Sequence, residues 1–293
     1  MDLITGNRFK EMCKYVYNPN IDMMERQVDN SNNYLETVFC ETHHLKQFFD
    51  LARGVGEYKK SNKLILVSHN SDGCIVPFKW RECDFHFEEH KIPSNVITAW
   101  YAQNMHVLSD RIRPIPMGLE NYKWHKGTKW AEIESMSKQQ IPRDKWLYLN
   151  VEPSTNPIER NLCINTLKNK GFVTNAKKVS YLQYLTEMKQ HKFVACPEGN
   201  GWDCHRTWEA LYMGCIPIVR RRVFTEMFSR LVPMVLIDDW NEITLERLNG
   251  FYFFNKQWEK FKSIADKYIH NSVYDGLTFS FWEKVIRGEI EIA

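Results

Sequence analysis

The sequence contains no C-x-x-C pair, little net charge, and no apolar run close to the ~20 residues that a transmembrane helix needs. Its formal charge of +3 is too weak to require nucleic acid or an acidic membrane surface as a partner. The 8 cysteines are scattered, and residues 1–8 show no apolar stretch typical of a secretion signal. We therefore expect a cytoplasmic chain with reduced thiols, no membrane span and no nucleic-acid partner.

The length and the hydrophobic content indicate a globular protein with a large interior. A chain of 293 residues fits two α/β domains of ~120 to 150 residues each better than a single core. Aromatic residues make up 14% of the chain, with 10 Trp, and such rings can serve as stacking platforms for sugars. A core rich in Trp nevertheless accounts for most of them.

Short apolar segments alternate with polar helical ones, which is typical of parallel α/β layering. The polar stretch 123–145, which contains Pro142, is the expected connection between two domains, at 1–135 and 136–255. Residues 256–293 carry two helical apolar stripes that need a partner surface. The pattern predicts strands at 63–68, 146–149 and 171–174, an extended segment at 112–117, and helices at 161–168, at 181–189 and from Thr244 onward.

The segment from Cys196 to Val219 combines a strand end, a Gly-rich turn, a helix and a second strand. Asp203 is the expected N-cap of the helix, and Gly214 is its expected stop. Helix N-termini present unpaired N–H groups, and Gly199 and Gly201 let the backbone approach a ligand closely. This unit therefore predicts an anion site.

Three polar side chains share one face of that helix. Glu209 lies three residues after Arg206 and four residues after His205. A guanidinium can bind phosphate oxygens, and a carboxylate can accept from sugar hydroxyls, so the face fits a nucleoside diphosphate. A structural Arg–Glu pair is the alternative, and the spacing alone does not decide between them.

The same segment resembles a known family. Its Pro197-Glu198-Gly199-Asn200-Gly201 turn, with the polar helix positions that follow, is similar to the signature of exostosin-like glycosyltransferases of the family 47 type, which include small soluble versions in large viruses and bacteria. The likeness covers roughly residues 60 to 245. Further matching positions are Asp203, His205-Arg206, Trp208-Glu209-Ala210-Leu211, Gly214, Ile216-Pro217-Ile218-Val219, Ser68-His69-Asn70-Ser71-Asp72, Trp100-Tyr101-Ala102-Gln103-Asn104, Ile115-Pro116-Met117-Gly118-Leu119-Glu120, Leu147–Asn150 and Arg160.

The resemblance implies the α/β GT-B fold, with two Rossmann-like domains whose parallel sheets face a central cleft. It also implies that the C-terminal domain holds a nucleotide sugar, that the N-terminal domain holds the glycan acceptor, and that the last helices pack back on the first domain. Uridine is the expected base, with a weak preference for xylose as the sugar. Golgi-resident relatives carry a membrane anchor, which this sequence does not show. The expected donor-binding residues are Arg160, Gly199, Asn200, Gly201, Asp203, His205, Arg206 and Glu209.

Sugar transfer needs a base that deprotonates the acceptor hydroxyl. Asp72 and His69 follow the strand at 63–68, at the edge where open α/β sheets bind ligands, and we prefer Asp72 as the base of an inverting reaction. Asn70, Trp100 and Asn104 are the expected acceptor contacts. An Asx turn formed by Asp72 before Gly73 is the structural alternative.

Charge on the leaving diphosphate must also be stabilised. No Asp-x-Asp triplet occurs, and that motif holds the metal in the other large glycosyltransferase fold, so we expect metal-independent transfer without a cofactor. Arg160, Arg206 and the amides of Asn200 and Gly201 would neutralise the diphosphate. The run Arg220–Arg222 lies at the end of a strand and forms either a solvated turn or a further phosphate contact.

Two other function classes fit parts of the sequence. His86-Phe87-Glu88-Glu89-His90 matches the H-x-x-E-H pattern of inverted zinc peptidases, in which His86, Glu89 and His90 would act. That pattern needs a helix, whereas Asp84–Phe87 alternates like a strand and Pro93 follows closely. A protein that binds a sugar nucleotide without turnover is the second alternative.

Overall fold

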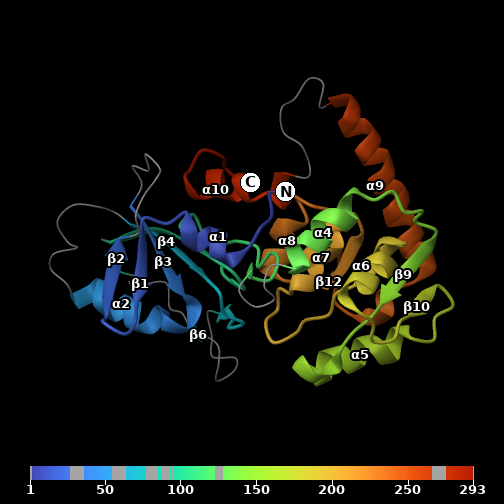
Figure 1. Ribbon diagram of the computed structural model, residues 1–293, viewed down its shortest axis with the longest axis horizontal. Helices are drawn as coiled ribbons and strands as arrows, with labels where there is room; N and C mark the ends of the chain where they lie inside the picture. The colour runs from blue at the N-terminus through green and yellow to red at the C-terminus, as the bar shows by residue number, and fades with distance from the viewer. Residues whose placement is uncertain are drawn as a thin grey trace. The chain divides into compact units, whose positions relative to one another are not determined.

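The computed structural model describes residues 2–26, 36–54, 64–76, 85–86, 93, 96–122, 128–265 and 275–292. The chain divides into two compact units (Figure 1). The N-terminal unit contains Asp2–Glu120, Gly201–Asp203 and Phe279–Ala293, and the C-terminal unit contains Asn121–Asn200 and Cys204–Thr278. The division falls after Glu120 rather than after residue 135. Both units have mostly parallel sheets, so the expected α/β class is confirmed.

The N-terminal unit has a six-stranded sheet in the order β2-β1-β3-β4-β7-β8. Only the β1–β2 pair is antiparallel among the described pairs of this sheet. Its strands are β1 (Tyr15–Asn18), β2 (Met23–Arg26), β3 (Thr37–Glu41), β4 (Leu64–His69), β7 (Ile97–Ala102) and β8 (Ile112–Pro114), and a small sheet pairs β5 (Ile75–Val76) with β6 (Phe85–His86). Its helices are α1 (Gly6–Glu11), η1 (Thr42–His44), α2 (Leu45–Gly54) and α10 (Phe279–Ile286).

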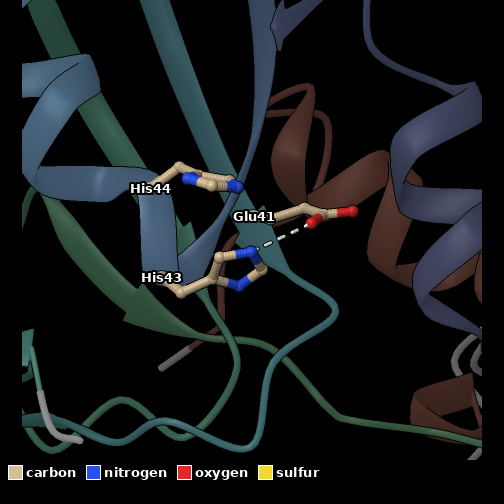
Figure 2. Close-up of side chains that lie close together, drawn as sticks. All are labelled: Glu41, His43 and His44. Carbon is tan, nitrogen blue, oxygen red and sulfur yellow. Dashed lines mark ion pairs between the residues drawn. The ribbon is translucent and has the colours of Figure 1, made fainter. Parts of the chain in front are cut away.

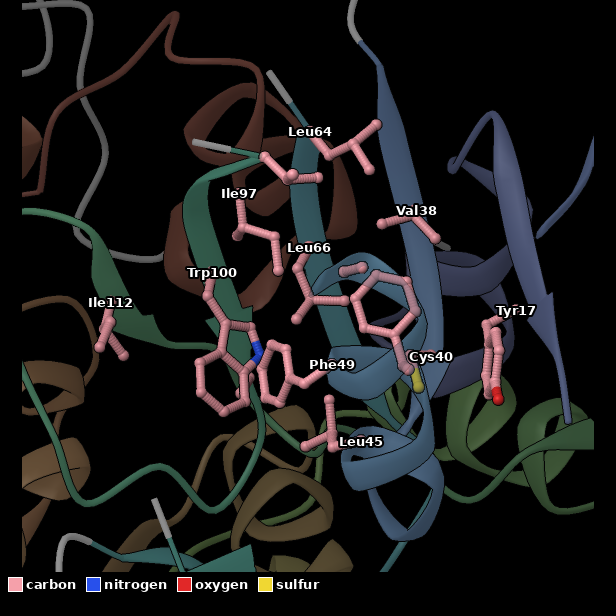
Figure 3. Packing of buried hydrophobic residues seen from close by; sticks show 14 of the residues in the cluster. Tyr17, Val38, Cys40, Leu45, Phe49, Leu64, Leu66, Ile97, Trp100 and Ile112 are labelled. Atoms are coloured by element: carbon pink, nitrogen blue, oxygen red, sulfur yellow. The ribbon is translucent and has the colours of Figure 1, made fainter. Parts of the chain in front are cut away.

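Apolar side chains of the strands and of α2 form the core of this unit (Figure 3). Strand β4 is almost continuously apolar because it lies between two parallel neighbours and is buried along most of its length. Trp100 of β7 is fully buried, and its ring meets that of Phe49 edge-on with centroids 5.4 Å apart. Helix α10 joins the same unit, where the hydroxyl of Tyr101 donates to the carbonyl oxygen of Val285 at 3.2 Å.

The C-terminal unit has a five-stranded parallel sheet in the order β10-β9-β11-β12-β13. Its strands are β9 (Lys145–Leu149), β10 (Val173–Asn175), β11 (His191–Ala195), β12 (Ile216–Arg220) and β13 (Val235–Ile237). Its helices are α4 (Thr128–Lys138), η3 (Pro153–Thr155), α5 (Pro157–Leu167), α6 (Tyr181–Lys189), α7 (His205–Tyr212), α8 (Val223–Phe228), η4 (Trp240–Glu242), α9 (Leu245–Ala265) and η5 (Asp275–Leu277).

Most of the expected helix boundaries are confirmed, and the local chemistry explains them. Helix α6 spans the predicted 181–189, because Ser180 caps it by accepting from the main-chain N of Gln183 at 3.3 Å. Helix α5 begins earlier than expected, where Asn156 is the N-cap and Pro157 occupies the first turn. The stretch 123–145 was expected as a connection, but it contains helix α4.

Within the part of the chain that the structure describes, no helix combines the length and the apolar character that a bilayer span requires.

Candidate functional site

The order of the strands in the sheet of the C-terminal unit reverses between β9 and β11. The chain leaves β9 for β10 on one side and then returns to β11 on the other. In open parallel sheets of this order, ligands bind at the carboxyl ends of the two strands at that switch point. The predicted Gly-rich turn follows β11, and the loop that contains Asn150 and Glu152 follows β9. The sequence motif therefore lies where the topology places a ligand site.

Arg160 of α5 connects these two loops. Its Nε donates to the main-chain oxygen of Glu198 at 3.0 Å, and its Nη1 donates to that of Glu152 at 2.7 Å. Burial lowers the pKa of the guanidinium. Arg160 thus contacts both loops of the switch point, and an anion here would find a guanidinium held by neutral carbonyl groups.

Arg206 of α7 approaches the same switch point from the other helix. Its Nη1 donates to the main-chain oxygen of Asn150, and its guanidinium carbon lies 5.6 Å from the ring centroid of Tyr184. Burial lowers the pKa of Arg206, but electrostatic partners that include the Glu209 carboxylate outweigh it and leave the pKa raised. Arg160 and Arg206 thus both hydrogen-bond to the loop after β9.

Glu209 is buried, and two tyrosines hold its carboxylate. The hydroxyl of Tyr181 donates to Oε1 at 2.8 Å, and that of Tyr184 donates to Oε2 at 3.0 Å. Burial, followed by the charge of Glu209, raises the pKa of Tyr181, so this hydroxyl stays a donor. The expected alternative of a structural Arg206–Glu209 pair is replaced by a tyrosine–carboxylate cluster. Two tyrosines three residues apart on the predicted helix were the only sequence signal for it.

The guanidinium of Arg160 lies close to Gly199. A Cβ at this position would lie 2.6 Å from Nη2 of Arg160 and 3.3 Å from Sγ of Cys204. We expected a ligand to approach the backbone closely at this glycine. In the structure, a side chain of the protein, Arg160, makes that close approach. Asn200 is exposed, and His205 is half-buried at the start of α7.

Two expected donor residues belong to the N-terminal unit instead. A Cβ on Gly201 would lie 2.7 Å from Nδ2 of Asn104, and the carboxylate of Asp203 accepts from the main-chain N of Met117 at 2.8 Å. The prediction that Asp203 caps the helix is wrong, because Cys204 is the N-cap and makes no side-chain cap hydrogen bond. The Asp203 carboxylate is thus bound to the main chain of Met117. The main-chain N of Asp203 donates to Oδ1 of Asn104 at 2.7 Å.

The arginine run after β12 forms ion pairs with acidic residues of the same unit. Arg222 binds the buried carboxylate of Glu198 through two hydrogen bonds of 2.6 and 3.0 Å. Arg220 binds Glu159 through two bonds of 2.8 Å. Burial raises the pKa of Glu198 although Arg222 opposes it. Arg220, whose side chain is 13% exposed, is therefore not part of a solvated turn.

In the N-terminal unit, His69 ends β4 and is buried. Its Nε2 lies 3.1 Å from the carbonyl oxygen of Pro116, which can only accept, and its Nδ1 lies 2.8 Å from the main-chain N of Asn70, which donates. The neutral ring therefore carries its proton on Nε2, and both nitrogens are engaged within the fold. His69 is consequently not placed to act as the base, which corrects that prediction.

Asp72 is exposed in the loop after β4. Its carboxylate is therefore in contact with solvent at the carboxyl edge of this sheet. The hydroxyl of the preceding Ser71 accepts from the main-chain N of Gly73 at 3.1 Å.

Two of the three expected acceptor contacts are buried and hydrogen-bonded within the N-terminal unit. Trp100 is fully buried and donates from Nε1 to the hydroxyl of Ser68 at 2.9 Å, so it cannot stack on a sugar. Asn104 is buried, and its side chain holds Asp203. Asn70 and Asn104 both have positive φ, +62° and +50°, at the ends of adjacent strands. Asn70 is the one of the three that is partly exposed.

The zinc-peptidase pattern lies mainly outside the described residues. Phe85–His86 form strand β6, as the alternation predicted, whereas Glu89 and His90 are not described. No protein-family model matches the chain, and no curated protein was found with a similar sequence.

Proposed function

We propose that this protein is a glycosyltransferase that moves a sugar from a nucleoside-diphosphate sugar, with uridine as the base, to a hydroxyl group of a glycan acceptor. The observation that carries the proposal is the convergence of Arg160 and Arg206 on the loop after β9, at the switch point of a parallel sheet. Both guanidinium groups bind main-chain carbonyl oxygens there, and a diphosphate would offer them charged acceptors instead.

Glu209 supports the ribose part of the proposal. A carboxylate has about four lone-pair sites, and the two tyrosine hydroxyls use two of them. The remaining sites can accept from the two hydroxyls of a ribose. Glu209 and Arg206 lie on the same helix, three residues apart, as a nucleoside diphosphate requires.

The chemistry would be an inverting displacement at the anomeric carbon. Asp72 would accept the proton of the acceptor hydroxyl as its oxygen bonds to that carbon, while the bond to the diphosphate breaks and the guanidinium groups stabilise the leaving group. The exposure of Asp72 supports this role, and the burial of His69 makes Asp72 the sole base in the proposal. Two arginines take the place of a metal at the diphosphate.

A thermal-shift screen of UDP, GDP, ADP and their sugar conjugates tests the proposal, because a ligand of the folded state raises the unfolding temperature. We expect uridine nucleotides to give the largest shift, and Asp72→Asn to abolish transfer while nucleotide affinity stays nearly intact. Binding without transfer to any glycan would favour the non-catalytic alternative. A chain that binds no nucleotide would refute the proposal, and peptide hydrolysis lost on Glu89→Gln would favour the peptidase.

A further inference from the structure

Two imidazoles and a carboxylate gather at the carboxyl end of strand β3. Glu41 is the last residue of β3, and His43 and His44 belong to the η1 turn that follows. The side chain of Thr42 between them is buried, which leaves its neighbours directed to the outside of the unit. Figure 2 shows the three side chains pointing toward one another. This cluster plays no part in the proposed transfer reaction.

The separations within the cluster suit a metal ion. Nε2 of His43 lies 3.3 Å from Oε2 of Glu41, and one ligand atom from each of the three residues lies within 4.8 Å of the other two. Ligands at ~2.0 to 2.2 Å from a tetrahedral zinc ion are about 3.4 Å apart. The Glu41–His43 pair already has that spacing, and the ring centroids of His43 and His44 are 4.0 Å apart.

Outside the cluster, Gln47 holds the ring of His44. Nδ1 of His44 lies 3.2 Å from Oε1 of Gln47, which is an acceptor, so Nδ1 carries the proton and Nε2 keeps its lone pair. Histidines that bind metals typically donate their other N–H group in this way, which fixes both the tautomer and the ring orientation. The first turn of α2 therefore presents His44 in the form that a metal requires.

We infer that Glu41, His43 and His44 form a binding site for a divalent transition metal, zinc in the first instance. Imidazole nitrogens select zinc and its neighbours over magnesium and calcium, which prefer sets of oxygen ligands. Three protein ligands leave a fourth position for water or a ligand oxygen. The side chains of His43 and Glu41 are 51% and 35% exposed, so an ion can reach them.

The site lies beside the candidate acceptor loop, since Glu41 is paired with His69 in the register of β3 and β4. It is nevertheless independent of the proposed function. None of the residues proposed to bind the diphosphate belongs to this cluster, and they lie in the C-terminal unit. A negative result for sugar transfer therefore leaves this inference standing, and the reverse also holds.

Calorimetric titration of the full chain with zinc chloride, after treatment with EDTA and dialysis, tests the inference. We expect one equivalent to bind to the wild type, and Glu41→Gln, His43→Ala and His44→Ala each to weaken binding at least about tenfold. Gln47→Ala should also weaken binding by about 10- to 100-fold, as loss of an outer partner does. Asp50→Asn and His205→Ala are matched controls that remove a carboxylate and an imidazole elsewhere, and they should leave the affinity unchanged.

Zinc should also raise the unfolding temperature of the wild type, and it should not do so for the triple variant that lacks all three ligands. A triple variant that still binds one equivalent with the affinity of the wild type would overturn the assignment. Binding of magnesium or calcium as tight as that of zinc would overturn the choice of metal. Circular dichroism of each variant establishes that lost binding is not lost folding.

Discussion

Nε of Arg160 donates a 3.0 Å hydrogen bond to the main-chain oxygen of Glu198, so a side chain of helix α5 holds the turn that follows strand β11. The hydrogen bond therefore fixes the turn and the guanidinium relative to each other. A diphosphate bound at the switch point would meet a cation that is already fixed in place, and little ordering entropy would remain to be lost.

Arg160→Ala should weaken UDP binding by about 10- to 100-fold, because a hydrogen bond to a charged group contributes about 1.5 to 3 kcal/mol. Arg160→Lys should restore only part of the affinity, since an ammonium group cannot make the forked contact. Calorimetric titration with UDP measures both effects. Equal affinity of wild type and Arg160→Ala, with equal unfolding temperatures, would contradict the proposed role.

Gly199→Ala should disturb the same contact. The new Cβ would lie 2.6 Å from Nη2 of Arg160, so the guanidinium must move, at a cost of about 1 to 3 kcal/mol of unfolding free energy. Gly171→Ala is the matched control, because a Cβ there meets nothing within 4 Å. Urea unfolding of both variants measures the difference. If Gly199→Ala loses no more unfolding free energy than Gly171→Ala, the Arg160 side chain can move away from the new Cβ at no measurable cost.

Glu209→Gln should weaken the binding of UDP but not that of inorganic pyrophosphate, which lacks the ribose. Tyr184→Phe should destabilise the fold more than Tyr181→Phe, because the bond from Tyr184 to Glu209 is buried and that from Tyr181 only partly so. Titrations with the two ligands separate ribose from phosphate recognition. An equal loss of affinity for UDP and for pyrophosphate would show that Glu209 stabilises the whole site and does not bind the ribose.

Sugar transfer should survive EDTA, because Arg160 and Arg206 are proposed to neutralise the diphosphate. The chelator should at the same time remove zinc from Glu41, His43 and His44, which elemental analysis of the dialysed protein would show. Complete loss of transfer in EDTA, restored by Mn²⁺ or Mg²⁺, would contradict metal-independent transfer.

Acidification should weaken the fold through His191. This residue is fully buried, with Nδ1 2.7 Å from the carbonyl oxygen of Glu187 and Nε2 2.8 Å from the hydroxyl of Thr174. Burial lowers the pKa of this imidazole below its ordinary value of 6.5, although the bond to Glu187 opposes it. Below that pH the unfolded chain binds the proton more readily than the folded one, so the unfolding free energy decreases as the pH falls.

The contribution of this single proton cannot exceed ~1.4 kcal/mol per pH unit. Urea unfolding between pH 7 and pH 5 should therefore show a shallower pH dependence for His191→Gln than for the wild type. The remaining histidines are common to both proteins and cancel in the comparison. Identical slopes would show that His191 is protonated equally in both states.

Local patterns were enough to predict much of the fold. The apolar run at Leu64–Val67, the cap at Ser180 and the stop at Gly214, where φ is +72°, depend on neighbouring residues in the chain, so the sequence alone indicated strand, helix start and helix end. The α/β class followed from the alternation of such segments. Helix α4 was missed because its apolar face is weakly marked among charged residues.

The site was only partly predictable, because its partners are far apart in the sequence. The helix face of Arg206 and Glu209 was determined by spacing along the chain, which local geometry fixes. Only the tertiary structure decided that Tyr181 and Tyr184 hold Glu209, that Asp203 serves Met117, and that Trp100 and His69 are buried. Residue type and spacing specify what a side chain can bind, whereas the packing of distant segments decides which groups reach it and whether solvent or a ligand can.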